Sequence, residues 1–255
     1  MSSVISNTTD GRQTSAVVSH ASGWGAAHDH VGFSTPTTNE ASTTIFGPRA
    51  ESAAFRGGIY FISRAFFDFD LSGVSIPAGQ TITEAFFKIK TATNGGHDNI
   101  VVKSGHDPST TSDSWFSTWL TGQGITLSGW SSSDVTAYSS NYTAASGGSF
   151  STVTLNATAL TDLNSAAGTS TPFKIAVINY DFDYLDVDPQ PSSGLQRTGC
   201  HFADDTNSGN RPNLALNFGA ATTGYGSNVI GVSSSDIAKV NGVATGDIGK
   251  VIGVD

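Results

Sequence analysis

Four aspartates follow a strongly apolar run late in the chain and form its densest acidic stretch. They are Asp181, Asp183, Asp186 and Asp188, within the segment DFDYLDVDP. On an extended strand, residues two apart share a face, which would bring Asp181 and Asp183 together. Clustered oxygen ligands suit Ca²⁺, although the glycine and closing glutamate of an EF-hand are missing. The segment is therefore a candidate Ca²⁺ site, and the alternative is a solvated loop after a buried strand.

Tryptophans in loop-like sequence are the second candidate set. Trp24, Trp115 and Trp119, with Trp130 further on, lie in stretches rich in Ser, Thr and Gly. Flat aromatic faces pack against sugar rings, so exposed tryptophans would form a glycan-stacking platform. The alternative is packing in the core or at a subunit interface, where large aromatic side chains dominate.

Histidines beside aspartates recur in the chain. His28 and His30 flank Asp29, and on a strand their side chains would share a face and could hold a transition metal. No third ligand is evident, and surface histidines in a loop are the alternative. The pairs His97-Asp98 and His106-Asp107 lie beside glycines, where turn chemistry explains them.

Nothing in the sequence forms a recognisable catalytic motif. Asp68 and Asp70 are two apart on a predicted strand, which places them on the outer face of a sandwich rather than on either side of a substrate bond. A Gly-x-Ser-x-Gly elbow, a His-Glu-x-x-His motif and a phosphate loop are absent. Cys200 and His201 are neighbours, which is no evidence for a nucleophile and base. We expect a protein that is not an enzyme.

Composition narrows the class of partner. The 255 residues carry a formal net charge of −9, with only 12 Lys and Arg, scattered along the chain, which argues against nucleic-acid binding. A single cysteine excludes an intramolecular disulfide. No apolar run approaches the roughly 18 residues that span a membrane, and no signal peptide pattern is visible at the start. We expect no membrane partner and synthesis in the cytoplasm.

The hydrophobic pattern predicts an all-β fold. Alternating or continuous apolar runs predict strands at residues 59–70, 81–90, 100–102, 153–155, 173–180 and 214–218. In residues 81–90 the core candidates are Ile82, Phe86 and Ile89. Residues 107–134 read as a long loop or a few short strands, and only residues 160–167 suggest a helical turn. We expect a β-sandwich over 1–219, in which 1–50 are an N-terminal arm or the first strands.

A linker and a repeat follow the predicted sandwich. Residues 220–231 are rich in Gly, Ala, Thr and Ser, and 232–255 contain two similar units, DIAKVNGV and DIGKVIGV, offset by 11 residues. Each unit is too short to bury an apolar face alone, so we expect it to assemble with partners. The alternative is a frayed terminus. The apolar positions expected to mediate assembly are Ile237, Val240, Val243, Ile248, Val251 and Val254.

Three segments together resemble a known family. Residues 64–72 (RAFFDFDLS), 76–85 (IPAGQTITEA) and 201–214 (HFADD to NRPNL) are similar to the signature of DNRLRE-type domains. The resemblance covers about residues 40–218 and implies a jelly-roll-type β-sandwich, related in form to carbohydrate-binding modules. Asp204 and Asp205 depart from the usual closing motif of the family, so no ligand role is carried over to them.

The C-terminal units add a second resemblance. Residues 237–244 (IAKVNGVA) look like repeats near the ends of bacteriophage virion proteins. Together the two resemblances imply a structural or adhesive protein of a virion surface: a head decoration, a fibre or a tail-associated module. The expected partners are capsid or tail proteins and further copies of the chain, with a trimer as the expected oligomer. The alternative is an extracellular carbohydrate-binding module or adhesin that recognises cell-surface polysaccharide.

Overall fold

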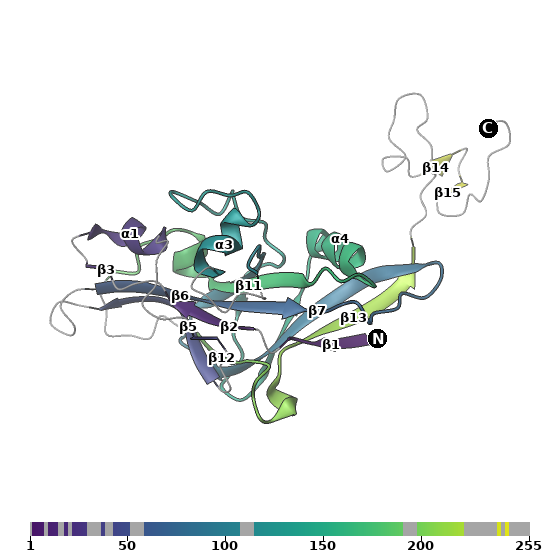
Figure 1. Cartoon of the computed structure of the whole chain (residues 1–255), viewed down its shortest axis with the longest axis horizontal. Helices are drawn as coiled ribbons and strands as arrows, with labels where there is room; N and C mark the ends of the chain where they lie inside the picture. Colours follow the sequence, from purple (N-terminus) through teal and green to yellow (C-terminus); the bar gives the residue numbers. More distant parts are fainter. Residues whose placement is uncertain are drawn as a thin grey trace.

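The computed structural model describes residues 2–7, 10–14, 18–19, 22–29, 37–38, 43–51, 59–107, 115–190, 198–221, 239–240 and 243–244. Strands dominate these residues, and they form two antiparallel sheets joined into one 13-stranded array (Figure 1). The all-β sandwich expected from the sequence is confirmed. Among the described residues, no helix is both long and apolar enough to cross a membrane.

The first sheet brings the two ends of the sandwich together. Its strands, in spatial order, are β1 (Ser2–Ile5), β13 (Asn213–Ala220), β7 (Gln80–Thr93) and β10 (Phe150–Thr154). Strand β13 lies between β1 and β7, so the start and the end of the sandwich sequence are hydrogen-bonded neighbours. The described part of residues 1–50 thus contributes first strands to the sandwich.

The second sheet is built around β6 (Ile59–Phe69) and β11 (Phe173–Asn179), which pair with each other. Strand β11 also pairs with β8 (Asp98–Lys103), and β8 pairs with β9 (Tyr142–Thr143). Strand β6 pairs with β2 (Gly11–Thr14), β3 (Val18–Ser19) and β5 (Thr43–Glu51), while β4 (Thr37–Thr38) pairs with β2. Strand β12 (Thr198–His201) pairs with both β5 and β7 and so joins the two sheets.

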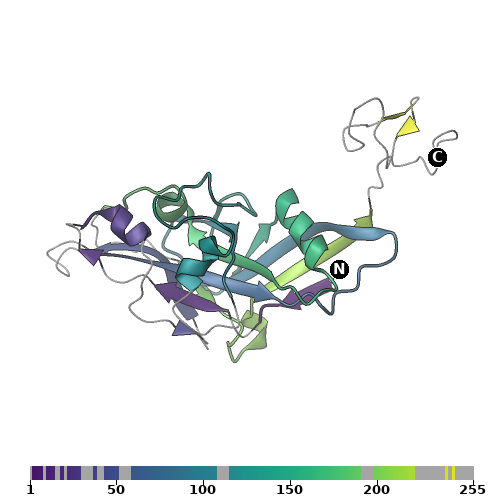
Figure 2. The ribbon, with the colours of Figure 1, turned by 45° about the horizontal axis from the view of Figure 1, so that its top comes forward.

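Short helices connect the strands and lie on one side of them in both views (Figures 1 and 2). They are α1 (Trp24–His28), α3 (Trp115–Thr121) and α4 (Ala157–Ala166). Helix α4 fits the helical turn expected near 160–167, and its N-cap Asn156 accepts a hydrogen bond from the Ala159 amide. Helix α3 corrects the expectation of loops or short strands over 107–134, because Trp115 and Trp119 are spaced to share one helix face.

The main core fills the space between the sheets. Phe67 and Phe69 of β6 point into it and meet Phe87 of β7, while Phe202 stacks on Phe67 with ring centroids 5.2 Å apart. In β7 the buried positions are Ile82, Ala85, Phe87 and Ile89. The prediction of Phe86 as a core residue is therefore wrong: the register of β7 with β13 shifts between Asn217 and Phe218, which changes the alternation between Ile82 and Ala85.

A second core covers the other face of the second sheet. Phe66, Val102, Ala176 and Ile178 pack there against side chains of α3 and the loop after it. This explains why β11 reads as continuously apolar: it is buried on both faces. The prediction that Asp68 lies on an open outer face is wrong. Asp68 is buried and is hydrogen-bonded to Ser6 and Asn7 of the N-terminal segment, whereas Asp70 is exposed.

The C-terminal boundary lies slightly beyond residue 219. Strand β13 ends at Ala220, and the Ala221 amide donates a hydrogen bond to the Gly79 carbonyl. Within the first repeat unit, β14 (Lys239–Val240) and β15 (Val243–Ala244) pair as antiparallel strands, with Val240 opposite Val243. The linker from 222 onward and the other expected assembly residues, Ile237, Ile248, Val251 and Val254, lie outside the described residues.

Truncating an aromatic side chain of the main core tests this packing. Phe67→Ala removes a fully buried ring and should lower the free energy of unfolding by about 3–5 kcal/mol, measured by urea denaturation. Phe150→Ala is the matched control, because its ring is 39% exposed, and it should cost clearly less. Equal losses at the two positions would contradict the assignment of the core.

Candidate functional site

The four aspartates after β11 do not gather around one point, although two of them approach His28. Its Nε2 lies 3.6 Å from Asp183 Oδ1 and its Nδ1 lies 3.5 Å from Asp186 Oδ1. The chain turns into a π-helix, η2 (Tyr180–Tyr184), directly after the strand, so the two-residue alternation that would align them is lost. Asp181 accepts a hydrogen bond from the Asp98 amide, and Asp183 pairs with Arg64. Asp186 accepts one from Trp24 and Asp188 one from Tyr60. The carboxylates therefore tie the loop to β8, to β6 and to α1, and Asp183 and Asp188 both bind side chains of β6.

All four carboxylates have protein partners, and the Ca²⁺ site expected at these residues stays a prediction from the sequence. Among the described residues, no group of three or more His, Cys, Asp or Glu side chains is placed to hold a metal ion. The proposed pair His28 and His30 is not tested as a whole, since His30 lies outside the described residues. His28 lies on α1, so the strand spacing assumed for that pair does not apply.

Arg64 occupies the centre of these interactions. Its side chain is fully buried, and its Nε and Nη2 donate to the two carboxylate oxygens of Asp183 at 2.9 and 2.8 Å. The guanidinium carbon lies 4.7 Å from the ring centroid of Trp119 and 5.4 Å from that of Trp130. Arg64 is thus held by a bidentate ion pair and by two cation–π contacts.

His28 completes this arrangement, which we call the Arg64 cluster: Arg64, Asp183, His28, Trp119 and Trp130. The imidazole stacks on Trp130 with ring centroids 4.3 Å apart, and its Nε2 lies 2.9 Å from the Asp183 carbonyl oxygen. Arg64 Nη2 also donates to the His28 carbonyl. The cluster therefore joins α1, β6, α3 with its following loop, and η2 in the interior.

The tryptophans of the predicted glycan platform are all buried. Trp115 and Trp119 belong to the second core, and Trp24 packs with Tyr60 in a small separate cluster. A stacking platform needs ring faces open to solvent, which Trp24, Trp115 and Trp119 do not offer here. Their arrangement matches the alternative of core packing.

The other pairs singled out in the sequence also have structural partners. Cys200 is buried in the main core, and the neighbouring His201 points elsewhere, with its Nδ1 against the Asp205 carboxylate. Asp68 and Asp70 differ in burial, as described above, and do not form a carboxylate pair around an open site.

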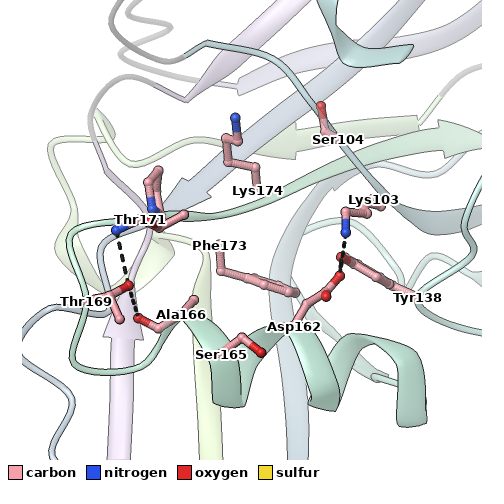
Figure 3. A pocket seen from close by; sticks show the side chains of 11 residues that line it. Lys103, Ser104, Tyr138, Asp162, Ser165, Ala166, Thr169, Thr171, Phe173 and Lys174 are labelled. Carbon is pink, nitrogen blue, oxygen red and sulfur yellow. Dashed lines mark hydrogen bonds and ion pairs between the residues drawn. The ribbon is translucent and has the colours of Figure 1, made fainter. Parts of the chain in front are cut away.

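A pocket of about 340 Å³ lies between α4 and the loop that leads into β11 (Figure 3). On one side of β11, the Asp162 carboxylate of α4 accepts hydrogen bonds from Lys103, at 2.8 Å, and from the Tyr138 hydroxyl. Burial and the bond to Asp162 raise the pKa of Tyr138. Burial opposes ionisation of Asp162, but the bonds from Lys103 and Tyr138 prevail and lower its pKa.

Lys174 points away from this group in the same view. Its Nζ donates to the His106 carbonyl at 2.7 Å, and partial burial lowers the pKa of Lys174. His106 itself is fully buried, and its Nδ1 lies 2.7 Å from the Ser104 hydroxyl. Burial, assisted by the charge of Lys174, lowers the pKa of His106 to about 3. The pocket thus combines apolar side chains, such as Ala166 and Phe173, with hydroxyl groups and the already paired Lys103 and Asp162, a mixed lining of the kind that holds small ligands.

The outer face of the first sheet is the second candidate surface. Ile5, Asn213, Lys88 and Thr152 lie opposite one another across its four strands. With Ser3, Phe150 and Arg211 they line a hollow of about 420 Å³, and we call this set the open face. Ile5 and Phe150 are 50% and 39% exposed, which sets them apart from the buried aromatics of the two cores.

Compared with known proteins, the chain matches no family model, and no curated protein matches it. The resemblances to DNRLRE-type domains and to phage repeats therefore stay predictions from the residues.

Sequence reasoning missed both the Arg64 cluster and the open face. One signal for the cluster was present: an arginine inside an apolar strand is rarely buried unless it is paired. The open face had no local signal, because its residues come from four distant segments and meet only through strand register.

Breaking the buried ion pair tests the role of the Arg64 cluster. Arg64→Met and Asp183→Leu should each lower the free energy of unfolding by about 3–5 kcal/mol, because each leaves a buried charge without its partner. The double variant should lose less than the sum of the two. Lys103→Met, which breaks a half-exposed pair with Asp162, should cost about 1 kcal/mol or less. Strictly additive losses would contradict the pairing.

His106 should make stability depend on pH. In the unfolded chain the His106 imidazole takes up a proton near pH 6.5, whereas in the folded protein it does so only near pH 3. The free energy of unfolding therefore falls as the pH is lowered from 6.5 toward 3. Between pH 7 and 4.5, the wild type should lose about 2–3 kcal/mol more than His106→Gln in urea unfolding. The same substitution at the partly exposed His97 controls for loss of one imidazole. Parallel pH profiles for wild type and His106→Gln would contradict the burial of a neutral His106.

Proposed function

We propose that this chain is a non-enzymatic structural and adhesive protein of a bacteriophage virion surface. In this proposal the sandwich projects a binding surface, and the C-terminal repeat assembles copies of the chain with one another and with capsid or tail proteins. Head decoration, fibre and tail-associated module are the roles that the two sequence resemblances imply.

The proposal that the chain assembles through its C-terminal repeat is supported by the strand pair in the first repeat unit. Strands β14 and β15 are two residues long each, and a hairpin this small is marginal in water by itself. It gains stability when further strands or apolar surfaces pack against it. Valines that face each other in its register, Val240 and Val243, are among the residues expected to mediate assembly.

The proposed adhesive role is supported by where charged and apolar side chains lie in the sandwich. Arg64 and Asp183 link chain segments in the interior, and Trp24 and the exposed Asp186 link two segments nearer the surface. On the open face, the exposed side chains of Ile5 and Phe150 lie beside the half-buried Lys88 and Arg211. The arrangement favours a rigid body that displays a surface for binding.

A carbohydrate-binding module is the second candidate function. The pocket of Figure 3 favours it, because a volume of about 340 Å³ lined by Ser165, Thr169 and Thr171 beside the Lys103–Asp162 pair suits a small hydroxyl-rich ligand. In that case the chain works alone, and assembly through the repeat is not required.

Solution mass separates the two candidates. The full chain should be a trimer or larger by light scattering, whereas a version ending at Ala221, which keeps β13 and the Ala221–Gly79 hydrogen bond, should be a monomer. The physical reason is that only the full chain carries the repeat. Monomers in both cases would contradict assembly through the repeat and favour the stand-alone binding module.

A further inference from the structure

The open face brings together three features: positively charged side chains, exposed apolar surface, and hydroxyl and amide groups. Lys88 and Arg211 line its hollow, and Lys90 lies on the same side of β7, directly opposite Phe150. These features point to the chemistry of what binds there.

The cations of this face form no direct ion pair with a carboxylate of the described residues; the Asp205 carboxylate reaches Lys90 only through the Asn210 side chain. Lys90 donates to the neutral Asn210 side chain, and Arg211 donates through Nε to the Asp205 carbonyl. Within the described part of the chain, no ion pair joins Lys88, Lys90 or Arg211 to a carboxylate, in contrast to Arg64 and Lys103. On a protein with a net charge of −9, three adjacent unpaired cations mark a site for an external anion.

One acidic side chain, Glu84, also lies on the outer side of β7, further along the strand from the cations. Glu84 is four residues from Lys88 on β7, opposite Asn217, whose amide donates to the Glu84 carboxylate. The cationic end of the face, around Lys88 and Arg211, is therefore the end that an anion would occupy.

The remaining groups favour a sugar chain as the carrier of that anion. Ile5 and Phe150 offer apolar surface for the C–H faces of sugar rings, while Ser3, Thr152 and Asn213 offer hydroxyl and amide groups. Arginine and lysine bind carboxylates by charge-assisted hydrogen bonds. We propose that the open face binds a carboxylate-bearing, acidic polysaccharide. The proposal deepens the adhesive half of the proposed function and does not depend on assembly through the repeat.

Binding of the full chain to polygalacturonate, with neutral dextran as the comparison polymer, tests the proposal. Calorimetry at low salt should show binding to polygalacturonate and none to dextran, and 0.5 M NaCl should weaken it about tenfold or more, because exposed charges are screened. Lys88→Gln should weaken binding several-fold. Thr152→Asp, which places a carboxylate opposite Lys88, should weaken it about tenfold or more.

A matched control separates the face from general charge effects. Thr158→Asp introduces the same change at an exposed position in the first turn of α4, where a carboxylate is tolerated, and should leave binding within about twofold of wild type. Unfolding midpoints of all variants check that each is folded.

Several results would overturn the proposal. It fails if polygalacturonate does not bind, if dextran binds equally well, or if Thr152→Asp and Thr158→Asp weaken binding alike. It also fails if Thr152→Asp changes the solution mass of the chain without affecting the polysaccharide, since the face would then be an interface between copies. Assembly through the repeat is tested separately, by comparing the solution mass of the full chain with that of the chain ending at Ala221. Loss of polysaccharide binding and loss of assembly can therefore be told apart.

Discussion

The ion pair between Arg64 and Asp183 is the interaction that holds the segments covering the second sheet together. Both side chains are fully buried, and a buried charge is tolerated only with close partners. Through Arg64 the pair fixes β6 against Trp119 and Trp130, and through the Asp183 backbone it fixes His28 of α1. The loop after β11 and the N-terminal helix are therefore anchored to the same point, although they are far apart in sequence.

The residues that stabilise the fold are therefore different from those that form the proposed binding surface. The aspartates that looked like metal ligands and the tryptophans that looked like sugar contacts are used to hold segments together, for example Trp24 with Asp186. The first sheet needs no such anchors, because its inner face packs on the main core while its outer face is left with Lys88, Phe150 and their neighbours. A rigid interior and an open sheet face suit a protein that is displayed on a larger particle.

The strands at 59–70, 81–90 and 173–180 could be predicted because alternation and apolar runs are local signals. The hydrogen-bond partners of the four aspartates could not be predicted from the sequence. The π-helical turn after Asn179 sets their directions, and the hydrophobic pattern gives no signal for that turn. Phe86 was misassigned because a shift in strand register changes which face alternate residues occupy. The open face depends on pairing among four distant segments, which a single sequence does not reveal.

Amide hydrogen exchange of the full chain, with and without polygalacturonate, distinguishes the interior, which holds the fold, from the open face, which binds. We expect added protection in the edge strands β1 and β10 and in the turn at Ser208–Asn210, with little change in α1 and η2 around the Arg64 cluster. Protection confined to α4 and the loop before β11, where the pocket of Figure 3 lies, would contradict the claim and assign binding to that pocket.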